Sequence, residues 1–291
     1  DDFVQALGRH VQFAQVCPEV AIGLGVPRDP IRIIERRGER SLVQPSTGRD
    51  LSEPMRQFAE TFLDNVGPVD GFILKNRSPS CGIKDVKIFA AAEQAPAVGK
   101  SAGFFAAAVL RRCSHAAIED EGRLTNSRLR HHFLTRVFAN ARLREARRQR
   151  EPAALVWFHT EYKLQLMAYS QTGLTSLGRI VANREGLSLE RVLAAYAERL
   201  AQVMAHPARP ASMRNALQHA FGYVSDSLSA KERRYFLGLL EDYSRERLPL
   251  TSLLTVLRAW VLRFDTRYLD SQRLFEPYPA PLMELGPQEA V

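Results

Sequence analysis

Two of the three cysteines lie in loop-forming stretches where their sulfurs could do chemistry. Cys17 stands in "VCPEV", after a strand-like run, and Cys81 stands in "KNRSPSCG", after the short apolar run "GFILK". The Pro, Ser and Gly residues around them favour ordered loops over core positions. Thiolates bind metals and attack electrophiles, and the cations Lys75 and Arg77 favour the thiolate form of Cys81. The alternative is that each cysteine is a small apolar residue at the end of a strand.

The third cysteine, Cys113, ends the Ala-rich helical stretch "AGFFAAAVLRRC", which is typical of a structural cysteine. Two thiolates are too few for a zinc or iron–sulfur site, because such sites take about four protein ligands. Three ligands could hold a cluster and leave one iron open. From the residues alone, a metal site is therefore one ligand short. No rival catalytic motif is present, and "GLGVPR" lacks the spacing of a dinucleotide-binding fingerprint.

The first 150 residues alternate between helix-like and strand-like segments. "PMRQFAETFLDNV" and "SAGFFAAAVLRRCS" predict helices, whereas "GFILK" and "KDVKIFA" predict short strands. This alternation indicates an α/β domain with a parallel sheet. Ligands bind such sheets outside the carboxyl ends of the strands. Two cysteines that are far apart in the sequence would therefore meet in one crevice.

After residue 151 the strand-like runs disappear and long amphipathic segments follow. Several begin at a suitable N-cap, and Ser229 and Glu232 have the spacing of a capping box. The pattern predicts an all-α helical bundle. Pro152 follows the basic stretch, so we place the boundary at residues 149–152, between domains 1–150 and 151–291. The Pro-rich tail from Glu276 onward is expected to be extended or mobile.

One segment carries essentially all of the net charge of +8. Between Arg123 and Arg150 there are nine Arg and a single acid, Glu145, whereas the residues after Arg150 have 16 Lys and Arg against 15 Asp and Glu. Arg without Lys favours bidentate phosphate recognition over a merely solvated helix face, which is the alternative. The pattern favours nucleic acid as partner. The candidate RNA-binding residues are Lys75, Arg77, Arg130, Arg136, Arg142, Arg144, Arg147, Arg148 and Arg150.

Composition sets the broad class of the protein. Hydrophobic residues make up 45% of the chain and charged residues 25%, which is ordinary for a soluble globular protein. The first residues lack the character of a signal peptide, and three cysteines do not make a disulfide framework. We therefore expect a protein of the reducing cytoplasm. The first residue is not Met, so we expect the native chain to begin upstream.

Several motifs carry a resemblance to known families. "VCPEVAIGLGVPR", "GFILKNRSPSCGIKDVKIF" and "EDEGRLTN" resemble the bacterial thiouracil desulfidase family. "FHTEYKLQLMAYS", "LGRIVAN" and "LLTVLRAWVLRFDTRYLDSQRLFEPYP" resemble the YbgA-like helical domain that is often fused to it. The arrangement is similar to that of bacterial tRNA 4-thiouridine desulfidases. The resemblance implies a Rossmann-like N-terminal domain followed by an all-α domain.

The resemblance also implies roles for particular residues. It implies a 4Fe-4S cluster held by three cysteines, with the sulfur of the thiolated base on the fourth iron. Cys17 and Cys81 match two ligands, and the third lies in a Cys-Leu-Leu-Gly segment of the family that would precede Asp1. Glu19 matches an acidic residue for proton transfer. One of Ser78 and Ser80 matches an active-site serine, and the motif leaves open which one.

These observations lead to one expected function and two alternatives. We expect non-redox desulfuration of 4-thiouridine in tRNA, with the Arg-rich segment on the phosphate backbone. One alternative is that the substrate is free thiouracil, although a free base needs no phosphate-binding groove. The other is a non-catalytic nucleic-acid-binding or partner-binding protein with an incomplete cluster site.

Overall fold

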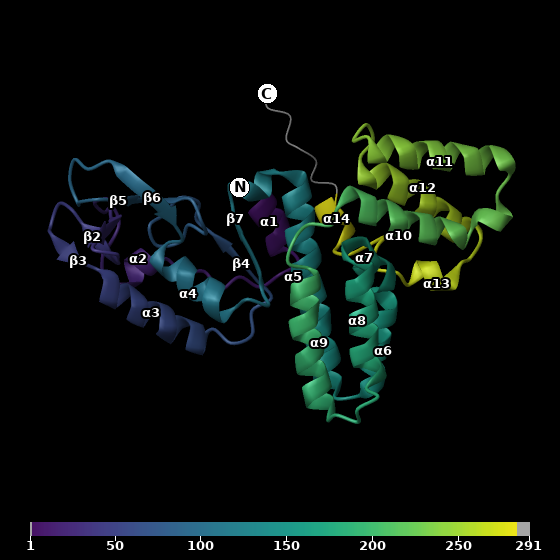
Figure 1. The fold of residues 1–291 in the computed structure, drawn as a ribbon, viewed down its shortest axis with the longest axis horizontal. Helices are drawn as coiled ribbons and strands as arrows, with labels where there is room; N and C mark the ends of the chain where they lie inside the picture. Colours follow the sequence, from purple (N-terminus) through teal and green to yellow (C-terminus); the bar gives the residue numbers. More distant parts are fainter. Residues whose placement is uncertain (1, 284–291) are drawn as a thin grey trace. The chain divides into compact units, whose positions relative to one another are not determined.

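The computed structural model describes residues 2–283, which form two compact units. The N-terminal unit comprises residues 2–133, and the C-terminal unit comprises Leu134–Met283 (Figure 1). The units divide within one helix, α5 (Ser127–Gln149). At the end of α5, Arg150 adopts a φ of 54°, and Pro152 begins the next helix. The chain thus turns at residues 149–152, while the division into compact units comes earlier in the sequence.

The N-terminal unit has a mixed sheet and a separate parallel pair of strands. The five-stranded sheet has the order β3-β2-β1-β5-β6, in which only β1 and β5 are parallel. Strands β4 (Gly71–Leu74) and β7 (Ala117–Asp120) form the parallel pair. The α/β prediction is confirmed, but the expected parallel sheet is a mixed one, because β2 pairs antiparallel with β1 and β3, and β6 with β5. The strands of the larger sheet are β1 (Arg32–Arg36), β2 (Glu39–Gln44), β3 (Arg49–Asp50), β5 (Val86–Phe89) and β6 (Ala97–Ser101).

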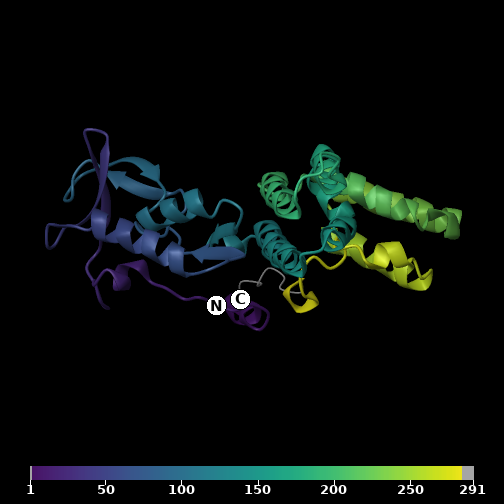
Figure 2. The same ribbon diagram turned by 90° about the horizontal axis from the view of Figure 1, so that it is seen from below.

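The helices of this unit follow from their apolar spacing. In α3 (Ser52–Asn65) the buried residues Ser52, Met55, Ala59 and Leu63 recur every three or four positions and form one face. Helix α4 (Phe104–Arg112) buries Phe105 and Val109 in the same way, and Figures 1 and 2 show the two helices side by side. Shorter helices are α1 (Asp2–Gly8), α2 (Pro18–Ala21) and the 3-10 turn Arg123–Thr125.

One predicted strand is absent. Residues 12–17, the strand-like run before Cys17, form neither helix nor strand, so that expectation is wrong. This run has exposed side chains at Phe13 and Val16 and no strand beside it. Its apolar residues therefore do not enter the sheet. Cys17 instead stands at the N-cap of α2.

The described part of the C-terminal unit contains helices and no strand, as predicted. Its core is rich in aromatic residues, and the Phe158 and Tyr162 rings stack at 4.4 Å between centroids. The capping box at Ser229 and Glu232 is present. The helices that follow α5 are α6 (Pro152–Glu161), α7 (Lys163–Tyr169), α8 (Gln171–Ala182), α9 (Leu189–Val203), α10 (Pro210–Gly222), α11 (Ala230–Ser244), α12 (Leu250–Arg263), α13 (Arg267–Asp270) and α14 (Ala280–Met283), with a 3-10 turn at Ser225–Ser227.

The expectation of an extended or mobile tail is wrong for its described part. Tyr278 and Leu282 are buried, and α14 is helical, because the apolar side chains of this segment pack into the protein. The rest of the tail, residues 284–291, lies outside the described residues. Within the described range, no helix has both the length and the apolar character needed to cross a bilayer.

Candidate active site

The loop that carries Cys81 begins where strand β4 ends. Strand β4 ends at Leu74, and its parallel partner β7 ends at Asp120, so the two following loops leave the same edge. In the loop, Ser78 accepts hydrogen bonds at Oγ from the backbone N–H groups of Ser80 and Cys81, each at 3.2 Å. The Gly82 N–H donates to the Ser78 carbonyl at 2.8 Å. Ser78 therefore closes a tight turn that orients Cys81.

The same turn is fastened to the start of helix α4 through its backbone. The carbonyls of Pro79 and Ser80 accept hydrogen bonds from the N–H groups of Phe104 and Ala106 at 3.1 and 3.0 Å. These N–H groups lie in the first turn of α4, where a helix leaves its donors without internal partners. A Cβ at Gly103 would lie 2.5 Å from the Ser80 carbonyl carbon, so only glycine allows this close approach.

The acidic motif after β7 holds the beginning of the loop. Glu121 accepts a hydrogen bond from the Asn76 N–H at 2.7 Å and pairs with Lys75 Nζ at 2.7 Å. Burial opposes ionisation of Glu121, but the hydrogen bonds from Lys75 and Asn76 bring its pKa below the ordinary value. Glu119 pairs with Arg123 Nε at 2.6 Å. The motif "EDEG" thus positions the cysteine loop from its N-terminal side.

Glu19 joins the two cysteine loops. Its Oε1 atom accepts hydrogen bonds from Ser78 Oγ at 3.2 Å and from Ser80 Oγ at 3.0 Å, from the distant loop. Its Oε2 atom accepts a hydrogen bond from Arg28 Nε at 2.7 Å. The predicted meeting of the "CPE" and "SPSC" segments is therefore confirmed at Glu19 and both serines. Ser80 has no exposed surface, whereas Ser78 is half-buried.

The two cysteines differ in their environments. Cys17 is exposed and accepts a hydrogen bond at Sγ from Arg28 Nη2 at 3.5 Å. Cys81 is half-buried, and burial, followed by the charges of Glu19 and Cys17, raises its pKa to about 12. The expectation that Lys75 and Arg77 favour the Cys81 thiolate is therefore wrong. The two cysteine loops are linked through Glu19, which accepts hydrogen bonds from the serines of the Cys81 loop and from Arg28, a donor to Cys17 Sγ.

The donor atoms present provide only part of a metal centre. Across residues 2–283, no three His, Cys, Asp or Glu side chains are arranged to hold a metal ion. Cys17 and Cys81 are soft sulfur donors in one site, so they fit two positions of a thiolate-bound cluster. Cys113 does not join them: it caps the C-terminus of α4 and packs against the core. This position agrees with the prediction that Cys113 is a structural cysteine.

Two of the predicted RNA-binding arginines donate hydrogen bonds within the protein. Arg130 is buried, and its guanidinium donates to the Leu124 carbonyl at 3.1 Å. Arg142 donates to Tyr162 Oη at 2.9 Å and to the Pro277 carbonyl at 2.6 Å. The prediction is therefore wrong for the buried Arg130, whereas Arg142 is half-buried and its RNA contact stays a prediction.

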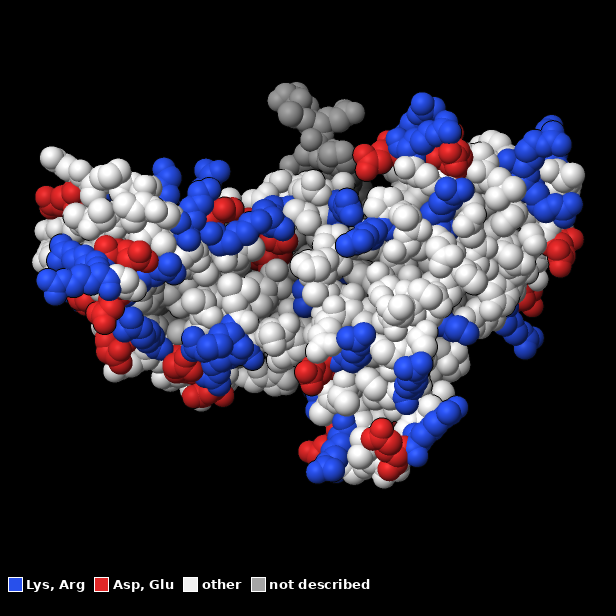
Figure 3. Space-filling model, viewed as in Figure 1, with Lys and Arg blue, Asp and Glu red and all other residues white. Residues whose placement is uncertain are grey.

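The other basic candidates differ in exposure. Arg136 and Arg144 are half-buried and have partners within the protein. Lys75 is exposed but paired with Glu121. Basic and acidic side chains are interspersed on the face drawn in Figure 3, rather than forming one basic surface. The exposed candidates are Lys75 and Arg77 in the cysteine loop and Arg147, Arg148 and Arg150 at the end of α5, of which Arg148 pairs with Glu145 at 3.5 Å.

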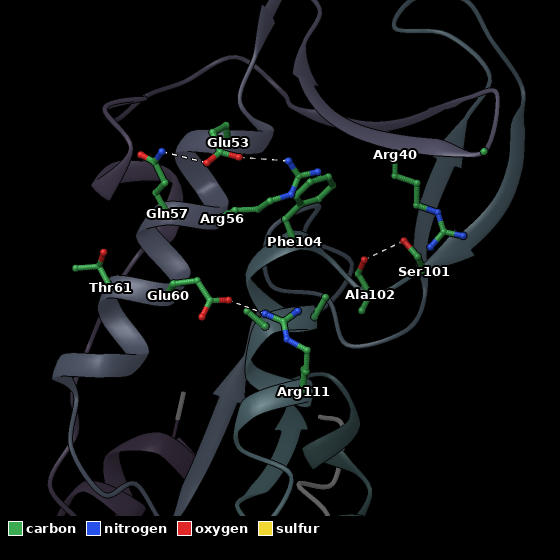
Figure 4. A pocket seen from close by; sticks show the side chains of 13 residues that line it. Arg40, Glu53, Arg56, Gln57, Glu60, Thr61, Ser101, Ala102, Phe104 and Arg111 are labelled. Carbon is green, nitrogen blue, oxygen red and sulfur yellow. Dashed lines mark hydrogen bonds and ion pairs between the residues drawn. The ribbon is translucent and has the colours of Figure 1, made fainter.

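A groove of about 920 Å³ lies along helices α3 and α4, and its lining includes neither cysteine loop (Figure 4). Its lining has three basic side chains, Arg40, Arg56 and Arg111, and two acidic ones, Glu53 and Glu60. Arg111 pairs with Glu60 at 2.6 Å, and Arg56 pairs with Glu53 at 3.6 Å. The Arg56 guanidinium also lies 5.3 Å from the centre of the Phe104 ring. Two of the three basic side chains are thus paired within the groove, and the candidate active site remains at Glu19.

Arg28 is the functional candidate that sequence reasoning missed. Besides its bonds to Glu19 and Cys17, its Nη1 donates to the Gly25 carbonyl at 3.0 Å. The signal in the sequence was the pair of glycines in "GLGVPR". Gly23 and Gly25 adopt φ values of 86° and 71°, which glycine adopts readily and other residues rarely. They allow the chain to turn back so that Arg28 reaches Glu19.

Comparisons with known proteins identify the families that the two regions of the chain match. Residues 1–121 match the family described as 2-thiouracil desulfurase, and residues 163–279 match a protein family of unknown function, DUF1722. The uncharacterized protein YbgA of Escherichia coli (strain K12) is 31% identical over 151 residues, which cover 50% of this chain and 88% of YbgA. No solved structure matches the chain. The chain therefore belongs to the YbgA family through its DUF1722 region and carries an N-terminal domain of the 2-thiouracil desulfurase family.

Proposed function

We propose that this protein removes the sulfur of 4-thiouridine in tRNA and leaves uridine. Membership of the 2-thiouracil desulfurase family supports desulfuration of a thiolated uracil ring in general. The observation that carries the proposal is the Glu19 carboxylate, which lies beside Cys17 and accepts hydrogen bonds from Ser78 and Ser80 of the Cys81 loop. A carboxylate and two hydroxyls thus converge from segments about 60 residues apart, and each segment also carries a cysteine.

The cofactor we propose is a 4Fe-4S cluster, with Cys17 and Cys81 as two of its ligands. When bound, such a cluster supplies a soft Lewis acid that favours sulfur over water and polarises the C=S bond. The third ligand is expected in the Cys-Leu-Leu-Gly segment of the family. We propose a Rossmann-like architecture for the N-terminal domain on the same basis.

The protein's own residues would handle the proton. Replacement of C=S by C=O consumes one water and releases hydrogen sulfide, so no electrons are exchanged. Glu19 would accept a proton from the attacking water, and three donors hold its carboxylate in place for that step. Ser78 and Ser80 would orient the Glu19 carboxylate for this step, because each donates its hydroxyl hydrogen to Oε1.

The phosphate contacts we propose are the exposed arginines. Arg77 lies four residues before Cys81 and adopts a φ of 56°, an unusual conformation for a residue with a side chain. It can hold the phosphate next to a base that has turned out of its stack. Arg147, Arg148 and Arg150 would also bind the phosphate backbone. Such contacts fix the register of the RNA and weaken as salt rises.

A second candidate substrate is free thiouracil. Two observations favour it: the name of the matched family, and the structural roles of Arg130 and Arg142, which reduce the basic surface. A third candidate is a binding protein without activity. It is supported by the absence, among the described residues, of a third ligand beside the two cysteines.

One experiment separates these candidates. The protein, reconstituted with iron and sulfide, is incubated with tRNA containing 4-thiouridine and, separately, with 2-thiouracil. Nucleoside mass spectrometry and sulfide release are measured. We expect loss of 4-thiouridine from tRNA in the wild type and in Cys113→Ala, and no loss in Cys17→Ala. Conversion of 2-thiouracil alone would select the second candidate, and no conversion of either substrate would select the third.

A further inference from the structure

We propose that Arg28 is a positioning residue that holds the Glu19 carboxylate in register with Cys17 and the two serines. This role rests on the proposed desulfuration, in which Glu19 handles the proton. Arg28 has no part in the family-derived assignment of ligands and catalytic residues. The proposal gives a purpose to "GLGVPR", which does not fit a dinucleotide-binding motif.

The guanidinium of Arg28 contacts three groups with three different nitrogens. Nε donates to Glu19 Oε2 at 2.7 Å, Nη1 to the Gly25 carbonyl at 3.0 Å and Nη2 to Cys17 Sγ at 3.5 Å. A guanidinium is rigid and planar, so these contacts fix the directions of the carboxylate and the sulfur relative to each other. Lysine has a single nitrogen and cannot form the same set.

The contacts divide the two oxygens of Glu19 between two loops. Oε2 receives Arg28, and Oε1 receives Ser78 and Ser80. The serines alone could follow a rotating carboxylate, because hydroxyl groups rotate freely. Arg28 removes this freedom by holding Oε2 from the opposite side. The exposed fractions of the two side chains are 26% for Arg28 and 15% for Glu19, so solvent competes only partly for the contact.

Arg28 carries a positive charge in this position. The hydrogen bond to Glu19 raises the pKa of Arg28, although burial acts in the opposite direction. A guanidinium keeps its positive charge across the physiological pH range. Its contact with Glu19 is a charge-assisted hydrogen bond, which is shorter and stronger than a neutral one.

The kinetic test compares Arg28→Gln, Arg28→Lys and Arg36→Gln, with 4-thiouridine-containing tRNA as substrate. Arg36 is an exposed strand residue and serves as the matched control. Because a hydrogen bond to a charged group is worth about a 10- to 100-fold change, we expect kcat of Arg28→Gln to fall by about that factor. KM should stay nearly unchanged, since Arg28 acts through Glu19. Arg28→Lys should recover part of the loss, and Arg36→Gln should match the wild type.

The second test needs neither cofactor nor activity. In the metal-free, 15N-labelled protein, the Nε–H of Arg28 should give a slowly exchanging signal that shifts when Glu19 is replaced by Gln. Iron content and melting temperature are measured for each variant, so that a loss of cofactor or fold is seen directly. If Arg28→Gln does not fold, Arg28→Lys together with the Nε–H signal decides the question.

Three results would overturn the positioning role. They are wild-type kcat in Arg28→Gln, a raised KM with unchanged kcat, and an Nε–H signal that is insensitive to Glu19→Gln. If the wild type leaves 4-thiouridine unchanged, the proposed function fails and the catalytic purpose of Arg28 falls with it. The Nε–H signal would still report whether the contact between Arg28 and Glu19 exists, so the two failures are distinguishable.

Discussion

The two loops that form the candidate active site are held in place by different means. The Cys81 loop is fastened by backbone hydrogen bonds from Phe104 and Ala106 and by the close approach of Gly103. The Cys17 loop is held to its partner mainly through side chains, with Glu19 and Arg28 at the centre. The position of the Cys81 loop therefore depends on close backbone packing against α4, and that of the Cys17 loop depends on contacts between charged side chains. Substitutions in each loop should show which kind of contact holds it in place.

The largest effect is expected at the contact that the two loops share. Glu19→Gln keeps the size of the side chain but removes its charge and its ability to take a proton. Since a positioned acid–base residue contributes about 10²- to 10⁴-fold, kcat for desulfuration should fall within that range. The exposed Glu93→Gln is the matched control. Circular dichroism should show the same fold for both variants, and near-wild-type kcat in Glu19→Gln would rule out its proton-transfer role.

The next effect concerns the packing of the Cys81 loop against helix α4. In Gly103→Ala the new Cβ would lie 2.5 Å from the Ser80 carbonyl carbon, so the Cys81 turn must move away from α4. We expect the free energy of unfolding to fall by about 1–3 kcal/mol, the usual cost of overpacking. In Gly99→Ala the Cβ would make an ordinary contact at 3.7 Å with Ile88. Equal denaturation midpoints for these two variants would contradict the close approach.

A smaller effect is expected at Gly25, in the segment that brings Arg28 to Glu19 of the Cys17 loop. Gly25 adopts a φ of 71°, and a Cβ there would meet no neighbouring atom, so Gly25→Ala adds only backbone strain. The strain of a left-handed residue is about 1–2 kcal/mol. Gly238→Ala, within helix α11, should instead stabilise the protein by about 0.5–1 kcal/mol. The melting temperature should therefore fall in Gly25→Ala and rise in Gly238→Ala. A change of the same sign in both variants would contradict this interpretation.

The smallest effect is expected at the ion pair between Lys75 and Glu121, at the beginning of the Cys81 loop. Glu121→Gln removes the ion pair with Lys75 but retains an oxygen for the Asn76 N–H. The Lys75 side chain is 74% exposed, so the global stability should change by less than about 1 kcal/mol. Hydrogen exchange should be faster only in residues 75–77. Faster exchange throughout the loop would mean that the backbone contacts to α4 are not its main support.

Helices and buried strands could be predicted because their signals are local. The spacing of Met55, Ala59 and Leu63 indicated α3, and the apolar run "GFILK" indicated β4. Strands β1 and β2 were missed because charged residues interrupt them. They form a hairpin whose turn, Arg37–Gly38, adopts φ values of 53° and 83°. The strand expected before Cys17 was wrong because a short apolar run without a pairing partner does not form a strand.

By itself, the sequence determined the two domain types, the family membership and the residue types of the site. These depend on composition, periodicity and motif spacing, which are properties of neighbouring residues. Only the tertiary structure decided that Arg28 returns to Glu19 and that both serines share one carboxylate oxygen. It also decided that Arg142 is engaged by Tyr162 and Pro277, 20 and 135 residues away. The role of a charged side chain depends on partners that only the folded chain brings within hydrogen-bonding distance.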